Sequence, residues 1–181
     1  MFFDIFLSLC SAVVLGSITE YYFHRFKMHQ YVEEESPFKD LSINHLDHHE
    51  KLWPSGETNN GFGDDKGIFL FFQNYFTIGF AMLPAMVYSM ITISPWFPFV
   101  ILFMHTFMFV LTIDAHIATH YKTNVVHWCP RWYYKIWSEY HMTHHKKANS
   151  NFGFIYLFVA DFLFGTLEWR NRSVYLQSKV H

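Results

Sequence analysis

Ten of the chain's 13 histidines lie in four short clusters, and this pattern constrains the fold more than any other feature of the sequence. Neutral imidazole is the commonest metal-ligating side chain. Ten clustered imidazoles are too many for one ion and suit two. The fold must therefore bring four separated stretches of chain together. The members are His24 and His29 in HRFKMH, His45, His48 and His49 in HLDHH, His116 and His120 in HIATH, and His141, His144 and His145 in HMTHH.

The spacing within the clusters predicts shared helix faces. Residues three and four apart lie on one face of an α-helix. We therefore expect His116 and His120 to point the same way, and each HxxHH triplet to cover one face. His24 and His29 are five apart, about 140° around an α-helix, so they could bracket one ion or serve two. Ser42 is the predicted cap of a short helix that carries the first triplet.

Three apolar segments are each about long enough to cross a membrane. The chain is 51% hydrophobic and 22% aromatic, and its apolar residues gather in 2–19, 68–93 and 96–113. A hydrocarbon core of about 30 Å needs about 20 helical residues. We interpret the first segment as a retained anchor, because it lacks a basic start and a clear cleavage site. Segment 152–169 carries two acids and has basic flanks, so we predict an interfacial or re-entrant helix there.

The basic residues predict the orientation in the membrane. All 13 Lys and Arg lie in residues 25–66, 122–147 and 170–179, whereas the link at Ser94–Pro98 is uncharged. Basic loops stay in the cytosol, so we expect the histidine clusters on the cytosolic face and the N-terminus outside. The membrane would be the endoplasmic reticulum of a eukaryote or the plasma (inner) membrane of a bacterium. No basic patch indicates nucleic-acid binding.

Together these patterns predict the fold class and the domain organisation. We expect an all-α membrane protein with a single integral-membrane domain over residues 1–181. It should contain about three transmembrane helices, the interfacial or re-entrant helix, and a cytosolic histidine-rich helical cap. Four tryptophans are predicted anchors at the membrane interface. They are Trp96, Trp128, Trp132 and Trp137.

Polar residues near the clusters are candidates for orienting the imidazoles. A metal-ligating histidine usually donates its second ring N–H to a carboxylate, a carbonyl or water. His105, at a membrane depth about 16 Å from His116, could line a substrate cavity or be a hydrogen-bonded packing histidine. Asn151 could contact a ligand or turn the chain. The candidates for orienting residues are Glu20, Asp47, Asp114, Glu139 and Asn151.

The number of imidazoles favours iron. Imidazole also suits zinc, copper and nickel, so ligand type alone does not decide. A structural zinc site closes at four ligands. Ten imidazoles shared by two ions give about five each, which leaves roughly one position open for dioxygen on an octahedral ion. Zinc could replace iron in a purified form.

The four clusters together resemble the histidine boxes of the membrane fatty acid hydroxylase/sterol desaturase superfamily. The segments Asn151–Gly153 and Asp161–Thr166 are similar to the region that follows the last box there. The resemblance covers about Ser17–Leu167. It implies a non-haem di-iron monooxygenase with two Fe ions and O2 as co-substrate. It also implies a separate electron donor, either cytochrome-type or a ferredoxin with its reductase.

The resemblance further implies a lipid substrate and leaves the outcome open. Hydroxylation of a fatty acyl, sphingolipid or sterol chain is the favoured reaction. A desaturase or a carotenoid hydroxylase is the alternative within the superfamily. FGFIY at Phe152–Tyr156 resembles carotenoid hydroxylases, whereas HIATH and the FGT ending fit lipid and sterol hydroxylases better. A non-enzymatic metal transporter or sensor is the remaining alternative, which should place ligands at the bilayer midplane.

Overall fold

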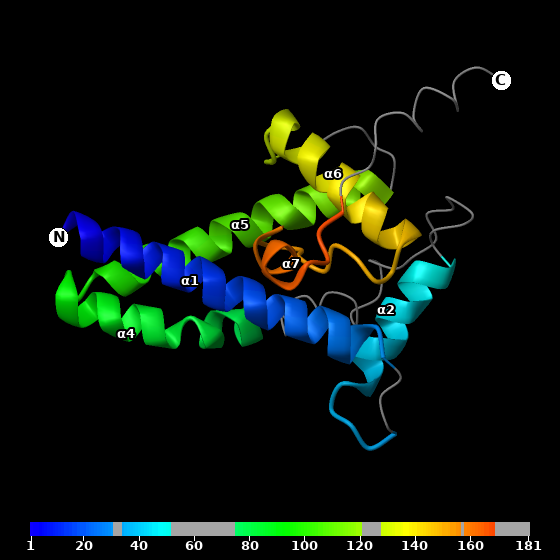
Figure 1. Ribbon diagram of the computed structural model, residues 1–181, viewed down its shortest axis with the longest axis horizontal. Coiled ribbons are helices and arrows are strands. Elements are labelled where there is room, and N and C mark those ends of the chain that lie inside the picture. Colours follow the sequence, from blue (N-terminus) through cyan, green and yellow to red (C-terminus); the bar gives the residue numbers. More distant parts are fainter. Residues whose placement is uncertain (31–33, 52–74, 121–127, 157, 169–181) are drawn as a thin grey trace.

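The computed structural model describes residues 1–30, 34–51, 75–120, 128–156 and 158–168, and the regular structure within these ranges is helical throughout. Figure 1 shows α1, α4 and α5 running side by side from the end that holds the N-terminus, with α2 and α6 at the other end. The helices are α1 Phe2–Phe23, the π-helix η1 His24–Met28, α2 Lys39–Lys51, α4 Leu83–Thr92, α5 Phe97–His120, α6 Arg131–Lys146 and α7 Val159–Phe164.

Two helices are long and apolar enough to cross a membrane, namely Phe2–Met28, which joins α1 to η1, and α5. A third candidate is the pair formed by Tyr75–Ala81 and α4, which is bent by 46°. Pro84 in the first turn of α4 accounts for the bend, because proline has no N–H for the preceding turn and its ring crowds that turn's carbonyl. The predicted all-α fold is confirmed for the described residues, which contain two or three candidates for the roughly three spans that were predicted; residues 68–74 lie outside them.

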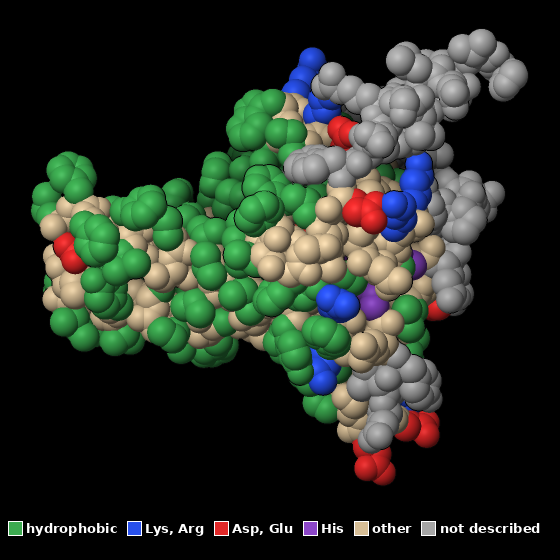
Figure 2. Space-filling model, in the orientation of Figure 1, with side chains coloured by type: hydrophobic (Ala, Val, Ile, Leu, Met, Phe, Trp, Pro, Cys, Tyr) green, Lys and Arg blue, Asp and Glu red, His purple; other side chains and the backbone are tan. Residues whose placement is uncertain are grey.

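The surface of the helical bundle is apolar. Figure 2 shows hydrophobic side chains covering the end with α1, α4 and α5, while most charged side chains gather at the opposite end. Phe3, Ile91 and Phe103 are each more than 70% exposed. An apolar surface of this extent is unfavourable in water and suits a hydrocarbon environment. It is therefore consistent with an integral membrane protein.

The segment between α6 and α7 enters the bundle and packs in its core. Ile155 and Tyr156 are buried together with residues of α1, α4 and α5. Gly16 of α1 makes this approach possible, since an added Cβ would lie 2.4 Å from Met82 Cε and 2.7 Å from Tyr156 Cε2. Packing in the core thus holds the segment that follows the last histidine triplet against α1.

The predicted helix over 152–169 is mostly wrong. Among its described residues only α7 is helical; the helix ends at Phe164, and Gly165, which follows it, has the left-handed φ of 69° typical of a helix C-terminus. Residues 152–156 are irregular because two buried carboxylates bind their N–H groups. Asp161 accepts hydrogen bonds from residues 152 and 153, and Glu20 accepts them from residues 155 and 156. Side-chain acceptors here replace the helical carbonyl acceptors.

Candidate metal centre

The junction of α1 and η1 places His24 and His29 together. The N–H of His29 donates to the carbonyl of His24, five residues earlier, at 3.2 Å. This is a π-helical hydrogen bond, and such bulges widen the turn. The expected separation of about 140° assumed an α-helix and is wrong here, since the two ring centroids lie 5.1 Å apart. The sequence left open whether His24 and His29 bracket one ion or serve two. The geometry brings both rings into one group, as bracketing one ion requires.

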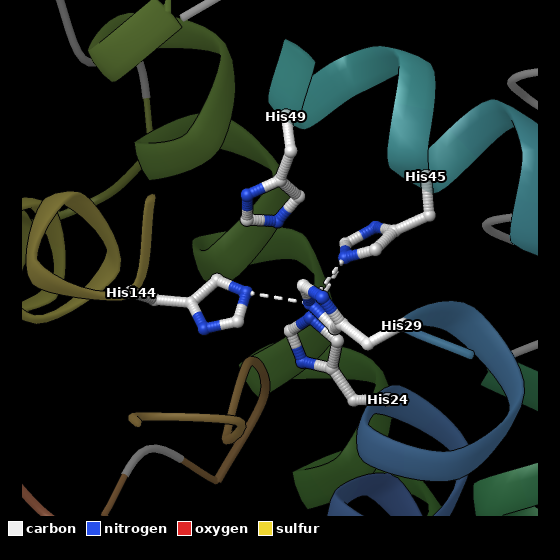
Figure 3. A group of neighbouring side chains, drawn as sticks. All are labelled: His24, His29, His45, His49 and His144. Atoms are coloured by element: carbon white, nitrogen blue, oxygen red, sulfur yellow. Dashed lines mark hydrogen bonds between the residues drawn. The ribbon is translucent and has the colours of Figure 1, made fainter. Parts of the chain in front are cut away.

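Five imidazoles converge from η1 and its end, α2 and α6. Figure 3 shows their rings pointing toward a common centre. One ring nitrogen of each lies within 4.8 Å of those of the others. This five-histidine group consists of His24, His29, His45, His49 and His144.

A second group lies beside the first. It draws its rings from α2, α5 and α6, again with one nitrogen of each within 4.8 Å of the others. His145 joins the two groups, because its Nε2 lies 3.0 Å from His141 Nε2 and its ring stacks on His49 at 4.2 Å. This four-histidine group consists of His48, His116, His120 and His141. All ten predicted histidines therefore meet in one place.

The distances between ring nitrogens match those of ligands around an ion. Three pairs of Nε2 atoms in the five-histidine group lie 3.0 Å apart. The Nε2 atoms of His120 and His141 in the other group lie 2.9 Å apart. Two nitrogens bound to one metal at about 2.1 Å each can lie no more than about 4.2 Å apart. These pairs are therefore close enough to bind one ion together.

Burial keeps these rings neutral. Desolvation is the largest cause of the shift in every case, and it lowers the pKa of His29 and His48 to about 3 and that of His49 to about 2. It lowers the pKa of His144 to about 4. Neighbouring imidazoles lower the pKa of the first three further. Neutral imidazole is the form that binds metals.

Hydrogen bonds among neutral rings cannot account for the five-histidine group. The Nδ1 atoms of His24 and His144 donate to backbone carbonyls, so their Nε2 atoms carry lone pairs. The contacts run from His24 to His45, then to His29 and His144. Only the two middle rings can supply an Nε2 proton for these three contacts. At least one contact therefore sets two lone pairs or two N–H groups against each other, and a cation bound by the Nε2 lone pairs would remove this mismatch.

Two further ring nitrogens have no hydrogen-bond partner among the described residues. They are the buried Nε2 atoms of His48 and His49, one in each group. A buried polar atom without a partner costs about 1–3 kcal/mol. A bound cation would satisfy both. The all-nitrogen donor set, its neutrality and these two atoms together fit a pair of transition-metal ions.

Backbone carbonyls orient two of the ligands. His24 Nδ1 donates to the carbonyl of Phe152 at 2.5 Å, and His144 Nδ1 donates to that of Ser150 at 2.7 Å. Each bond fixes the tautomer and the ring plane, which leaves Nε2 for the ion. The sequence predicted side chains for this role, four acidic and one amide, and did not indicate which backbone carbonyls would take it.

Three of the predicted orienting residues bind the backbone. Glu20 accepts from the N–H groups of residues 155 and 156. Asp114 Oδ2 accepts from the N–H groups of Trp128 and Cys129, both at 2.8 Å. Asn151 turns the chain with a φ of 55°, and its side chain binds the carbonyl of Tyr140 and the backbone of residue 168. The roles proposed for Asp47 and Glu139, both half-buried, stay predictions.

His105 and Trp137 are both core residues. His105 is fully buried, with Nδ1 2.8 Å from the hydroxyl of Tyr156 and Nε2 3.0 Å from the carbonyl of Tyr75. These are the surroundings of a packing histidine, and its role in a substrate cavity stays a prediction. Trp137 is fully buried and stacks on His141 at 4.5 Å, so the interface position predicted for it is wrong. Trp96, Trp128 and Trp132 are exposed.

Asp161 is the site-supporting residue that sequence reasoning missed. The sequence marked it only as a costly charge in an apolar segment. In the structure its buried carboxylate binds the loop whose carbonyls hold His24 and His144. The similarity of Asp161–Thr166 to the region after the last histidine box was the one available signal.

Comparison of the chain with protein-family models, with curated proteins and with solved structures finds no match.

Proposed function

We propose that this chain is a non-haem di-iron membrane monooxygenase that uses O2 to oxidise an unactivated C–H bond of a lipid. The observation that carries the proposal is the pair of adjacent groups of neutral imidazoles at one end of an apolar helical bundle. The five-histidine group offers more than four nitrogens, which suits an open redox site better than a closed structural one. The resemblance of the four clusters to the histidine boxes of fatty acid hydroxylases and sterol desaturases supports it.

The protein itself would bind the metal ions, orient their ligands and exclude water from them. Bound iron would supply the redox chemistry with dioxygen. Phe152 packs its ring against His144, and Phe154 packs against His116, at centroid distances of 5.6 and 5.2 Å. These aromatic walls exclude water and strengthen the electrostatic contacts inside. The exposed apolar surface of the bundle would give a lipid chain a path to the groups within the membrane.

The stoichiometry of hydroxylation determines how many electrons and protons must be supplied to the protein. One oxygen atom of O2 enters the C–H bond to give an alcohol, and the other leaves as water. This balance takes two electrons and two protons, which a separate cytochrome-type or ferredoxin donor would deliver. The basic segments beside the histidine clusters favour a cytosolic face for this encounter. The membrane would be the endoplasmic reticulum or the bacterial inner membrane, according to the host.

Desaturation and carotenoid hydroxylation are the second candidates, because the same centre with the same partners could produce them. A transporter is disfavoured by the arrangement of the ligands. The described ligands gather at one end of the bundle, whereas a transporter needs ionisable groups along its path. His105, a buried histidine deeper in the bundle, has both ring nitrogens bound within the protein.

Metal analysis and lipid analysis test the proposal together. The purified chain should hold about two iron ions, and lipids extracted from an expressing host should contain a product heavier by one oxygen atom. A product lighter by two hydrogens would select the desaturase. His48→Ala and His144→Ala should each abolish the product. His181→Ala, outside the four clusters, is the matched control that should keep both. A chain without bound metal, or active double variants at positions 48 and 144, would refute the proposal.

A further inference from the structure

Asp161 is a fully buried carboxylate that accepts four hydrogen bonds. Its Oδ1 accepts from the N–H of Phe152 at 2.9 Å and from the hydroxyl of Thr166 at 2.6 Å. Its Oδ2 accepts from the N–H of Gly153 at 2.8 Å and from the hydroxyl of Tyr140. All four donors point at a group that has only acceptors when ionised. The site therefore fits a carboxylate and disfavours an amide of the same shape.

These bonds fix the segment that orients two imidazoles of the five-histidine group. Phe152 gives its N–H to Asp161 and its carbonyl to His24. Ser150, two residues earlier, gives its carbonyl to His144. A shift of the backbone of residues 150–152 would therefore rotate the rings of His24 and His144. One carboxylate thus controls two ligands that are 120 residues apart in the chain.

Asp161 itself is held from the opposite side. The neighbouring N–H of Ala160 donates to Ser17 Oγ of α1 at 2.9 Å. α1 continues into η1, which supplies His24. The loop, α7 and η1 therefore form one closed set of contacts around the five-histidine group. The four-histidine group meets the same loop only one residue further on, through the ring of Phe154.

We propose that Asp161 is a positioning residue that sets the metal affinity of the five-histidine group and leaves the four-histidine group unaffected. The inference rests on the proposed metal binding. According to this inference, different contacts position the ligands of the two ions. A buried carboxylate and the backbone of residues 150–153 position one set, and helix spacing and aromatic packing position the other. Mutation of a residue that orients metal ligands typically lowers the metal affinity by about 10–100-fold.

The test is a Co²⁺ titration of the metal-stripped full chain in detergent, followed by absorption and by competition with a chelator. The wild type should take up about two ions. Asp161→Asn should weaken one of them by about 10–100-fold and shift only its absorption bands. Asp4→Asn, which removes a carboxylate at the far end of α1, is the control and should behave as wild type.

Double variants identify which ion is weakened. In the Asp161→Asn background, His45→Ala should leave one tight ion, because it removes a ligand from the group that is already weakened. His116→Ala in the same background should leave no tight ion. Equal weakening of both ions, or loss of the tight ion in the His45→Ala double variant, would overturn the inference.

Tyr140→Phe covers the case in which Asp161→Asn does not fold. It removes one donor to Asp161 and should lower the affinity of the same ion by a smaller factor. A wild-type affinity in Tyr140→Phe would then overturn the inference. A wild type that binds no Co²⁺ and no iron would refute the proposed function instead. Two ions bound equally by wild type and Asp161→Asn would refute only the role of Asp161.

Discussion

The two histidine groups lie side by side yet are built by different means. The four-histidine group takes His116 and His120 from adjacent turns of α5, so regular helix geometry aligns them. The five-histidine group takes His24 and His29 from a π-helix and relies on backbone carbonyls for orientation. One group therefore depends on local helix geometry, whereas the other depends on contacts that form only in the folded chain.

The largest expected effect separates the two groups by removing one ligand from each. His45→Ala should release one ion and His116→Ala the other, and each should abolish oxidation. A lost ligand should weaken its ion by more than about 100-fold, since residues behind the ligands already cost about 10–100-fold. Metal content per chain and product analysis check this. Release of both ions by either change would show that the groups are one cooperative site.

Acid should destabilise the metal-free chain. The folded pKa of His29 and His48 is about 3, and that of His144 about 4, whereas unfolded histidine has a pKa of about 6.5. Between these values the unfolded state binds more protons, so stability is full above about pH 6.5 and falls as the pH drops toward 3.

Thermal unfolding of the stripped chain at pH 7.5 and pH 5 measures this effect. The melting temperature should be clearly lower at pH 5. Bound Co²⁺ should raise it more at pH 7.5 than at pH 5, because protons and metal compete for the same nitrogens. A melting temperature independent of pH over this range would contradict burial of neutral rings.

Trp137→Phe should act mainly on the four-histidine group. The Trp137 ring stacks on His141, and its Nε1 donates to the carbonyl of Phe154 at 2.9 Å. Loss of the indole N–H removes a hydrogen bond worth about 0.5–1.5 kcal/mol. About tenfold weaker Co²⁺ binding at this group is expected, with the other group unchanged. Exposed Trp132→Phe is the control; equal effects of the two changes would deny the stacking role.

Ser17→Ala should give the smallest effect, on the five-histidine side. It leaves the buried N–H of Ala160 without its acceptor and loosens α7 from α1. A loss of about 1 kcal/mol in stability and a few-fold loss of metal affinity at the five-histidine group are expected. Ser17→Thr, which keeps the hydroxyl, provides the comparison. Weaker binding at the four-histidine group alone would contradict the arrangement described above.

Much of the architecture follows from local patterns. Hydropathy indicated the apolar helices, and the spacing of His116 and His120 predicted their shared face on α5. Clustering also predicted that all ten histidines meet. These predictions hold because helix periodicity and apolar length depend on residues close together in the chain.

The misses lie where distant contacts override local preference. Ser42 was the predicted cap of α2, but its hydroxyl donates to the carbonyl of Gln30, and Ser36 Oγ instead accepts from the N–H of Phe38 just before the helix. The helix predicted over 152–169 is cut short by acceptors on Asp161 and Glu20. Asp161 lies within this segment, whereas Glu20 is 135 residues from Ile155 and could not be identified as its partner from the segment itself.

The sequence by itself determined that this chain is helical, that apolar helices border histidine-rich segments, and that ten imidazoles are available as ligands, because these properties depend on composition and short-range periodicity. Only the tertiary structure decided how the ten divide, which ring atoms face one another, and which groups orient them. That division rests on a π-helical turn, on a loop held by a buried carboxylate and on contacts up to 143 residues apart. The free energy of such contacts belongs to the folded chain as a whole.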